Sequence, residues 1–160
     1  MEPLNVLITA ASRRVPLVQA FQKALAVQGC QGRVVATDVN PLSPAVHVAE
    51  RWYHVPLATS PDYLDAIIAI CEVERIGLVV PTIDDELEIL GAAAPWFLAR
   101  GIRVAVSPEW TSRTCNDKLA TCRHLREHGI RAAETWLPSE LISATSLPLF
   151  IKPRFGRGGV

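Results

Sequence analysis

The sequence reads Leu147-Pro148-Leu149-Phe150-Ile151-Lys152-Pro153-Arg154-Phe155-Gly156-Arg157-Gly158-Gly159-Val160 over residues 147–160. Its apolar first part predicts a buried strand. The three glycines predict a loop whose backbone N–H groups wrap an anion, because glycine has no side chain to keep a phosphate away and tolerates positive φ. Lys152 adds a positive charge beside that loop. A plain glycine-rich linker is the alternative interpretation.

A second segment, residues 116–129, favours the anion-binding interpretation of residues 147–160. Asn116-Asp117-Lys118 begins a helical stretch, Leu119 to His128, that stops at Gly129. The order of an Asp-Lys pair, a helix, Gly-Ile, a short strand, Pro-Leu-Phe-Ile-Lys-Pro and a glycine loop resembles the start of the ATP-grasp fold. The nearest likeness is to the large chain of carbamoyl-phosphate synthase and its single-unit, amino-acid-ligase-like relatives.

The resemblance implies a nucleotide site. In that family, cationic side chains at the positions of Lys118 and Lys152 reach the phosphates of ATP, and a loop with glycines at the positions of Gly156, Gly158 and Gly159 closes over them. The family also uses Mg²⁺, whose ligands lie well beyond the glycine loop. We therefore expect ATP and Mg²⁺ as cofactors and no metal ligand in this chain. The sequence does not identify the catalytic residues.

The first two thirds of the chain alternate between apolar strands and amphipathic helices. This alternation predicts an α/β fold with an open parallel, Rossmann-like sheet, because strand–helix–strand crossovers build parallel sheets. Predicted strands lie near residues 5–9, 33–38, 52–55, 78–82 and 102–106, and Ser60-Pro61-Asp62 predicts a helix start with a capping hydroxyl.

We place a domain boundary near Ser107. By the resemblance, residues 1–107 form the sheet domain that precedes the ATP-grasp unit (the pre-ATP-grasp domain), and 108–160 form the incomplete first lobe of the nucleotide-binding domain. In this lobe we expect a short strand near Glu134, a helix from Ser139 to Ser143 and the final apolar strand.

Polar residues follow the predicted strands of the first domain. Ligands bind outside the carboxyl ends of strands in open parallel sheets, so substrate contacts are expected from a set at that edge: Ser12, Arg13, Asp38, Asp84 and Glu86. The alternative for Ser12 is a helix cap, with Arg13 and Arg14 solvated. For the acidic residues the alternative is helix-end charge and turn chemistry.

Composition excludes other classes of protein. The 160 residues carry sixteen basic and sixteen acidic side chains, so no net field favours nucleic acid or an anionic membrane. The N-terminal residues do not resemble a signal peptide, no apolar run has the length of a membrane helix, and four scattered cysteines suit a reducing compartment. We therefore expect a cytoplasmic protein without nucleic-acid or membrane partners.

Two further motifs resemble known ligand-binding patterns. The turn Thr9 to Arg14 follows the first strand as in dinucleotide-binding proteins, but it contains no glycine, which disfavours NAD. His124-Leu125-Arg126-Glu127-His128 matches a zinc-peptidase pattern, but both histidines are expected on the solvent side of a helix.

The resemblance implies that the full-length protein is an ATP-dependent carboxylate–amine ligase, or an enzyme like carbamoyl-phosphate synthase, that works through an acyl phosphate. The 160 residues alone are expected to be inactive. The expected partners are a small-molecule carboxylate and an amine. The sequence also leaves open that the protein forms a homodimer. The rival interpretation is a non-catalytic, Rossmann-like scaffold or regulatory domain.

Overall fold

The computed structural model describes residues 3–141 and 147–156. The chain divides into two compact units, Met1–Glu109 and Trp110–Val160. The first unit is an α/β domain, and the second consists of short helices and extended chain.

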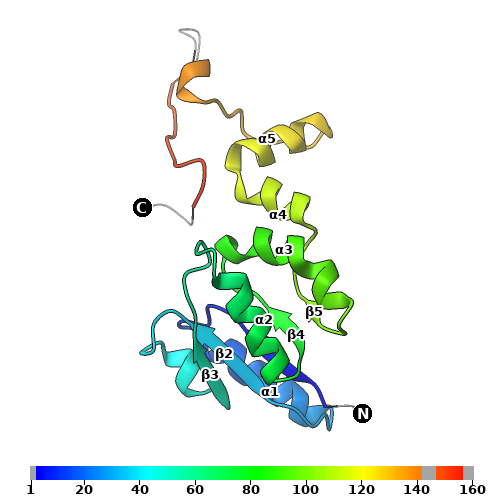
Figure 1. Ribbon diagram of the computed structural model, residues 1–160. Coiled ribbons are helices and arrows are strands. Elements are labelled where there is room, and N and C mark those ends of the chain that lie inside the picture. Colours follow the sequence, from blue (N-terminus) through cyan, green and yellow to red (C-terminus); the bar gives the residue numbers. More distant parts are fainter. Residues whose placement is uncertain (1–2, 142–146, 157–160) are drawn as a thin grey trace. The chain divides into compact units, whose positions relative to one another are not determined.

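A five-stranded parallel sheet forms the centre of the first unit, in the order β3-β2-β1-β4-β5 (Figure 1). β1 lies in the middle, with Val6 opposite Val34 on one side and Leu7 opposite Val79 on the other. The predicted open parallel α/β fold is confirmed. The strands are β1 (Asn5–Ile8), β2 (Val34–Asp38), β3 (Arg51–His54), β4 (Ile76–Val80) and β5 (Arg103–Val104).

Helices cover both faces of the sheet because the strands are apolar on both sides. Leu7 packs into the core beneath α2 and α3, whereas Val6 and Ile8 pack beneath α1 and the short helix η1 (Figure 1). This alternation follows from the two-residue period of a strand. The helices of this unit are α1 (Val15–Val27), η1 (Pro44–His47), α2 (Tyr63–Val73) and α3 (Asp84–Leu98).

The predicted start of α2 is wrong. The helix begins at Tyr63, with Asp62 as the residue before it, and no side chain caps it. Ser60 instead closes a turn, because its carbonyl oxygen accepts a hydrogen bond from Tyr63 N at 3.1 Å. The Tyr63 side chain is wholly buried, so the first residue of α2 belongs to the core.

The second unit contains α4 (Glu109–Asn116), α5 (Lys118–Glu127) and the short helix η2 (Pro138–Glu140). The helix expected from Leu119 to His128 is confirmed as α5. The expected helix from Ser139 to Ser143 is present only as the end of η2, and its last two residues lie outside the described part of the chain.

The two strands expected in the second unit are absent from its described residues. The chain around Glu134 is irregular, and Phe150 and Ile151 are about nine-tenths exposed. Apolar character alone does not make a strand, because a strand needs a neighbour to satisfy its N–H and C=O groups. Neither segment finds such a neighbour within the described residues.

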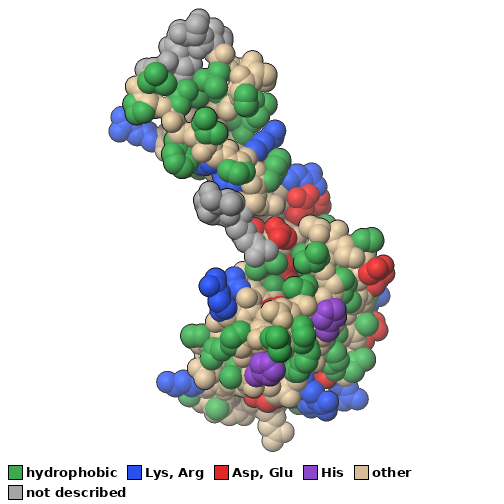
Figure 2. Space-filling view, turned by 90° about the vertical axis from the view of Figure 1, so that its left-hand side faces the viewer, with side chains coloured by type: hydrophobic (Ala, Val, Ile, Leu, Met, Phe, Trp, Pro, Cys, Tyr) green, Lys and Arg blue, Asp and Glu red, His purple; other side chains and the backbone are tan. Residues whose placement is uncertain are grey.

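Two observations concern the surface. Among the described residues, no helix combines the length and the hydrophobicity needed to cross a bilayer. On the face shown in Figure 2, basic, acidic and apolar side chains are interspersed over the first unit. This view therefore shows no field of a single sign.

Replacing Gly32 by alanine should destabilise the first unit. A Cβ atom at Gly32 would lie 2.0 Å from the Leu4 carbonyl oxygen, so the backbone before β1 would have to move. We expect a loss of about 1–3 kcal/mol in the free energy of unfolding, as for other overpacked sites, measured by urea denaturation. Gly29→Asn is the control, because Gly29 has open space around it and asparagine tolerates its positive φ. Equal midpoints for Gly32→Ala and the wild type would contradict this prediction.

Candidate functional site

The carboxyl edge of the sheet gathers polar residues from three strands. Thr9 follows β1, Asp38 ends β2 and Thr82 lies two residues after β4. Because the strands are parallel, these ends meet at one edge, as the sequence predicts. The side chains there are held by one another and by the backbone.

Glu86 enters this edge from the first turn of α3, whose N-terminal end carries Asp84, Asp85 and Glu86. Acidic residues favour this position because the helix dipole is positive there. Glu86 is 1% exposed. One of its carboxylate oxygens accepts hydrogen bonds from Thr9 Oγ1 at 2.9 Å and Thr82 N at 3.2 Å, and the other accepts from the Tyr63 hydroxyl.

Burial dominates the electrostatics of this cluster. Loss of hydration raises the pKa of Glu86, although the hydrogen bonds from Tyr63 and Thr9 act in the opposite direction. Burial and the neighbouring carboxylate raise the pKa of Tyr63 as well. The Glu86 carboxylate is thus occupied by three partners inside the fold, and the predicted substrate contact by Glu86 would require their rearrangement.

The turn after β1 is fixed by Asp38. Its Oδ2 accepts a hydrogen bond from Ser12 N at 2.6 Å, and its Oδ1 accepts one from Asn40 N at 2.8 Å. Ala10 and Ser12 both have positive φ, 45° and 47°, which costs energy for residues with a Cβ atom. The Asp38 carboxylate holds Ser12 in this conformation. Asp38 is 5% exposed, and backbone N–H groups already use both of its oxygens.

The alternative role for Ser12, a helix cap, is wrong. α1 begins at Val15, its N-cap residue is Arg14, and no side chain caps it. The solvated state considered for Arg14 is wrong too. Arg14 donates hydrogen bonds to the carbonyl oxygens of Thr82 at 2.7 Å and Ala10 at 3.3 Å, and so ties the turn to β4.

The structure thus brings Ser12 and Asp38 into contact and places Glu86 in the core, while Arg13 and Asp84 are exposed. Sequence reasoning missed Tyr63 and the threonines. Thr9 and Thr82 could have been predicted from the sequence, because each follows an apolar strand that ends at this edge of the sheet. Tyr63 could not have been predicted in this way, because only the packing of α2 places its hydroxyl at Glu86.

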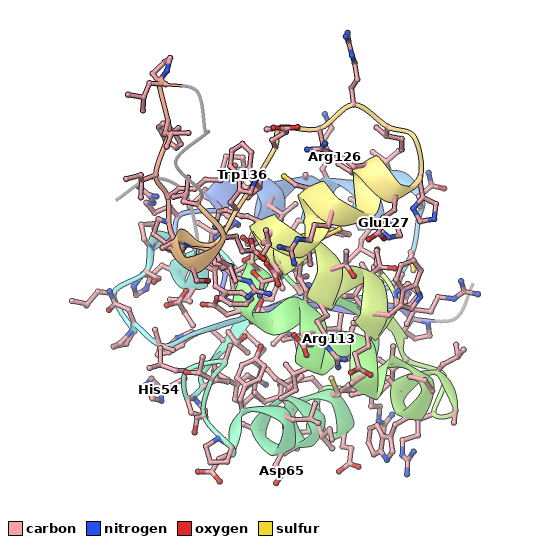
Figure 3. All side chains as sticks on the ribbon, turned by 90° about the horizontal axis from the view of Figure 1, so that it is seen from above. His54, Asp65, Arg113, Arg126, Glu127 and Trp136 are labelled. Carbon is pink, nitrogen blue, oxygen red and sulfur yellow. The ribbon has the colours of Figure 1, made fainter. Side chains whose placement is uncertain are left out.

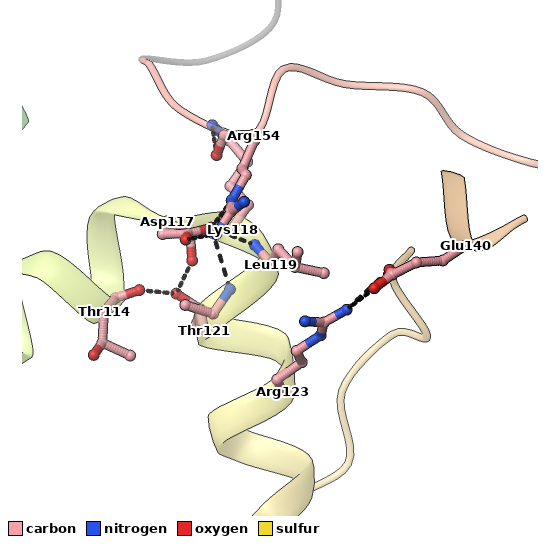
Figure 4. A network of polar contacts seen from close by, with 9 residues as sticks. Thr114, Asp117, Lys118, Leu119, Thr121, Arg123, Glu140 and Arg154 are labelled. Carbon is pink, nitrogen blue, oxygen red and sulfur yellow. Dashed lines mark hydrogen bonds and ion pairs between the residues drawn. The ribbon is translucent and has the colours of Figure 1, made fainter. Parts of the chain in front are cut away.

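The second unit holds a separate polar cluster around the start of α5 (Figure 4). Asp117 is the N-cap residue, and its Oδ1 accepts hydrogen bonds from Leu119 N at 3.0 Å and Ala120 N at 3.2 Å. Arg154 binds the same carboxylate with two nitrogens, Nε to Oδ1 at 2.9 Å and Nη2 to Oδ2 at 2.5 Å. The Arg154 guanidinium, assisted by the helix N–H groups, lowers the pKa of Asp117 to about 2.

Lys118 contacts residues 154–156, the glycine segment, next to the Asp117–Arg154 pair. Its Nζ donates hydrogen bonds to the carbonyl oxygen of Gly156 at 2.8 Å and, more weakly, to that of Arg154 at 3.5 Å. Lys152, the second expected cation, is exposed. Gly158 and Gly159 lie outside the described residues. The structure therefore joins Lys118 to the first of the three predicted glycines.

A groove of about 480 Å³ lies elsewhere in the second unit. Its lining combines cationic, acidic and aromatic side chains, and Figure 3 labels three of them, Arg126, Glu127 and Trp136. It includes none of the residues predicted to bind a ligand. Within residues 3–141 and 147–156, no group of three histidine, cysteine, aspartate or glutamate side chains could hold a metal ion.

A protein-family model matches most of the first unit. The model described as "PylC-like, N-terminal domain" matches residues 6–105, which is most of the first unit. No curated protein sequence matches the chain.

Several solved structures share the fold. The L-amino acid ligase from Bacillus licheniformis aligns with a TM-score of 0.69 and 19% identity, over 98% of this chain and 38% of that protein. N5-carboxyaminoimidazole synthetase from Staphylococcus aureus, solved with ADP, aligns with a TM-score of 0.52 and 12% identity, over 81% and 31%. Pyruvate carboxylase from Rhizobium etli aligns with a TM-score of 0.55 and 17% identity, over 79% and 12%. This chain therefore spans well under half the length of these neighbours.

Proposed function

The chain belongs to the family of PylC-like N-terminal domains, and from this membership we propose that it forms the sheet domain and the first part of the nucleotide-binding unit of an ATP-dependent ligase. The ligase would join a carboxylate to an amine. The membership and the fold of the neighbours support a pre-ATP-grasp domain of the carboxylate–amine ligase type. Beyond this, we propose that the ligase binds ATP and uses a carboxylate and an amine as substrates.

One contact carries the proposal within this chain. Lys118 and the Gly156 segment are 38 residues apart in sequence, yet the ammonium lies 2.8 Å from the Gly156 carbonyl oxygen. A phosphate-binding site of the expected kind needs a cation beside an accessible stretch of glycine backbone. The donor set, with Lys152 exposed on the same segment, fits phosphate groups. Among the described residues, no three histidine, cysteine, aspartate or glutamate side chains form a metal-binding group.

The proposed reaction has two steps. A carboxylate oxygen takes the γ-phosphoryl group of ATP, which gives an acyl phosphate and ADP. An amine then attacks the carbonyl carbon, the C–N bond forms, the C–O bond to phosphate breaks, and the amine loses a proton. Lys118 and Lys152 would neutralise phosphate charge and fix the direction of the triphosphate. The glycine segment would shield the acyl phosphate from water.

Two neighbours suggest the substrate classes. An L-amino acid ligase and a synthetase solved with ADP have the same fold as this chain. By analogy, an amino acid is the first carboxylate to test, and bicarbonate is the second.

The proposal is tested on the gene product that carries this chain. We expect magnesium-dependent binding of ATP in calorimetry, and ADP release that requires both a carboxylate and an amine. Hydroxylamine in place of the amine should trap the acyl phosphate as a hydroxamate. Absence of both ATP binding and carboxylate-dependent ADP release would refute the ligase and favour a scaffold.

A further inference from the structure

We propose that Asp117 and Arg154 form a latch that positions the glycine segment at Lys118. Both are positioning residues, because the latch acts on the nucleotide through Lys118 and Gly156. This inference rests on the proposed function for its consequence in catalysis, but the latch itself makes a prediction that needs no nucleotide.

Several contacts fasten residues 154–156 to the start of α5 (Figure 4). The Arg154 guanidinium holds Asp117 with two hydrogen bonds, at 2.9 and 2.5 Å. The backbone joins as well, since Lys118 N donates to the Arg154 carbonyl oxygen at 3.2 Å. These three contacts hold Arg154 and do not involve the Lys118 ammonium, so they remain available when that ammonium changes partner.

The latch differs from the other ion pairs described in this unit. The Arg154 side chain is 43% exposed, but the Asp117 side chain is only 10% exposed and also caps α5, so the carboxylate is fixed before Arg154 binds. In the pairs Arg123–Glu140 and Arg126–Glu134 both side chains are at least 38% exposed. Exposed pairs contribute little, because solvent screens them and two long side chains must be ordered. A bidentate pair on a fixed carboxylate is the stronger kind.

The contact between Lys118 and Gly156 defines what the latch achieves. The Lys118 ammonium donates to a carbonyl oxygen of the segment itself. A triphosphate would take over this ammonium, and the carbonyl would be released. Without another contact to α5, the segment would then move away from Lys118. Each binding event would have to order it again. Arg154 prevents this, since pre-ordering a loop lowers the entropy cost of binding.

The first experiment measures hydrogen exchange in the gene product that carries this chain, without nucleotide. Arg154→Gln should speed exchange of the Lys118 amide at least tenfold, because this N–H donates to the Arg154 carbonyl oxygen, while the later turns of α5 remain protected. Asp117→Asn should do the same, because asparagine keeps the N-cap hydrogen bonds but loses the charge. Arg126→Gln is the matched control, since it removes an exposed ion pair from the same unit. Unchanged exchange in both latch variants would overturn the inference.

The second experiment uses steady-state kinetics. Arg154→Gln should raise KM for ATP about tenfold with little change in kcat, because a lost anchor costs binding of the nucleotide and leaves the chemical step intact. Arg154→Lys should recover only part of the loss, since lysine restores the charge but not the two-pronged contact. A fall in kcat at unchanged KM would overturn the positioning role. If the wild type binds no ATP, the proposed function fails, and the exchange experiment alone decides on the latch.

Discussion

Glu86→Ala should destabilise the first unit by about 3–5 kcal/mol, since the substitution leaves buried hydroxyls without an acceptor and opens a cavity. Thr9 and Tyr63, both wholly buried, lose their bond to the carboxylate, and Thr82 N loses its side-chain acceptor. Domains are stable by only about 5–15 kcal/mol, so the effect is a large share of the total. Thermal and urea unfolding measure it.

The matched control is Asp84→Ala, which removes an exposed acid from the same helix turn. Its cost should stay within about 1 kcal/mol, the size of a helix-dipole contribution. If Glu86→Ala and Asp84→Ala shifted the unfolding midpoint equally, the buried hydrogen bonds of Glu86 would not stabilise the first unit as their geometry indicates.

Glu86→Gln should reveal the pH dependence of the same group. A carboxyl whose pKa is raised in the folded state binds its proton more tightly there than in the unfolded chain. Its contribution to stability is therefore complete below the unfolded pKa and decreases as pH rises through the folded pKa. Since the pKa of Glu86 is raised, the advantage of the wild type over Glu86→Gln should be greatest in mild acid and shrink toward neutral pH. A difference that grew with pH would contradict this assignment.

The second large effect concerns the two lysines. If the proposed ligase is correct, Lys118→Ala and Lys152→Ala should each lower kcat/KM for ATP about 10- to 100-fold, the range expected for a lost hydrogen bond to a charged group. ADP release under limiting ATP measures this. Lys23→Ala is the control, because Lys23 is an exposed lysine on α1, and its kinetics should match the wild type. Wild-type kinetics in both Lys118→Ala and Lys152→Ala would remove these residues from the phosphate site.

The first unit was largely predictable from the sequence because its signals are local. The Asn5–Ile8 and Val34–Asp38 strands each contain three consecutive apolar residues, and Pro16 near the start of α1 marks a helix. Such patterns survive in the fold because each element buries the side that its sequence marks as apolar. The resemblance to the ATP-grasp group is confirmed on the same part of the chain by the family match.

The parts that sequence reasoning misjudged depend on partners distant in the chain. Glu86 appears in the sequence as an acid at a helix start, and only Tyr63, 23 residues earlier, reveals it as a core residue. Arg154 appears as one charge in a glycine-rich stretch, whereas its partner Asp117 lies 37 residues before it. The apolar run from Leu147 was expected to be a strand, but pairing is a property of two segments, which a single run of residues does not report.

The central place of β1 has a consequence for synthesis of the protein. β1 leaves the ribosome before the other four strands of this sheet, yet one of its two neighbours, β4, is made about 70 residues later. A nascent chain that ends before Ile76 can pair β1 on one side alone, so the sheet is completed late and over a long separation in sequence. Until then one edge of β1 keeps its backbone N–H and C=O groups unpaired, which is the feature that lets strands of different chains associate.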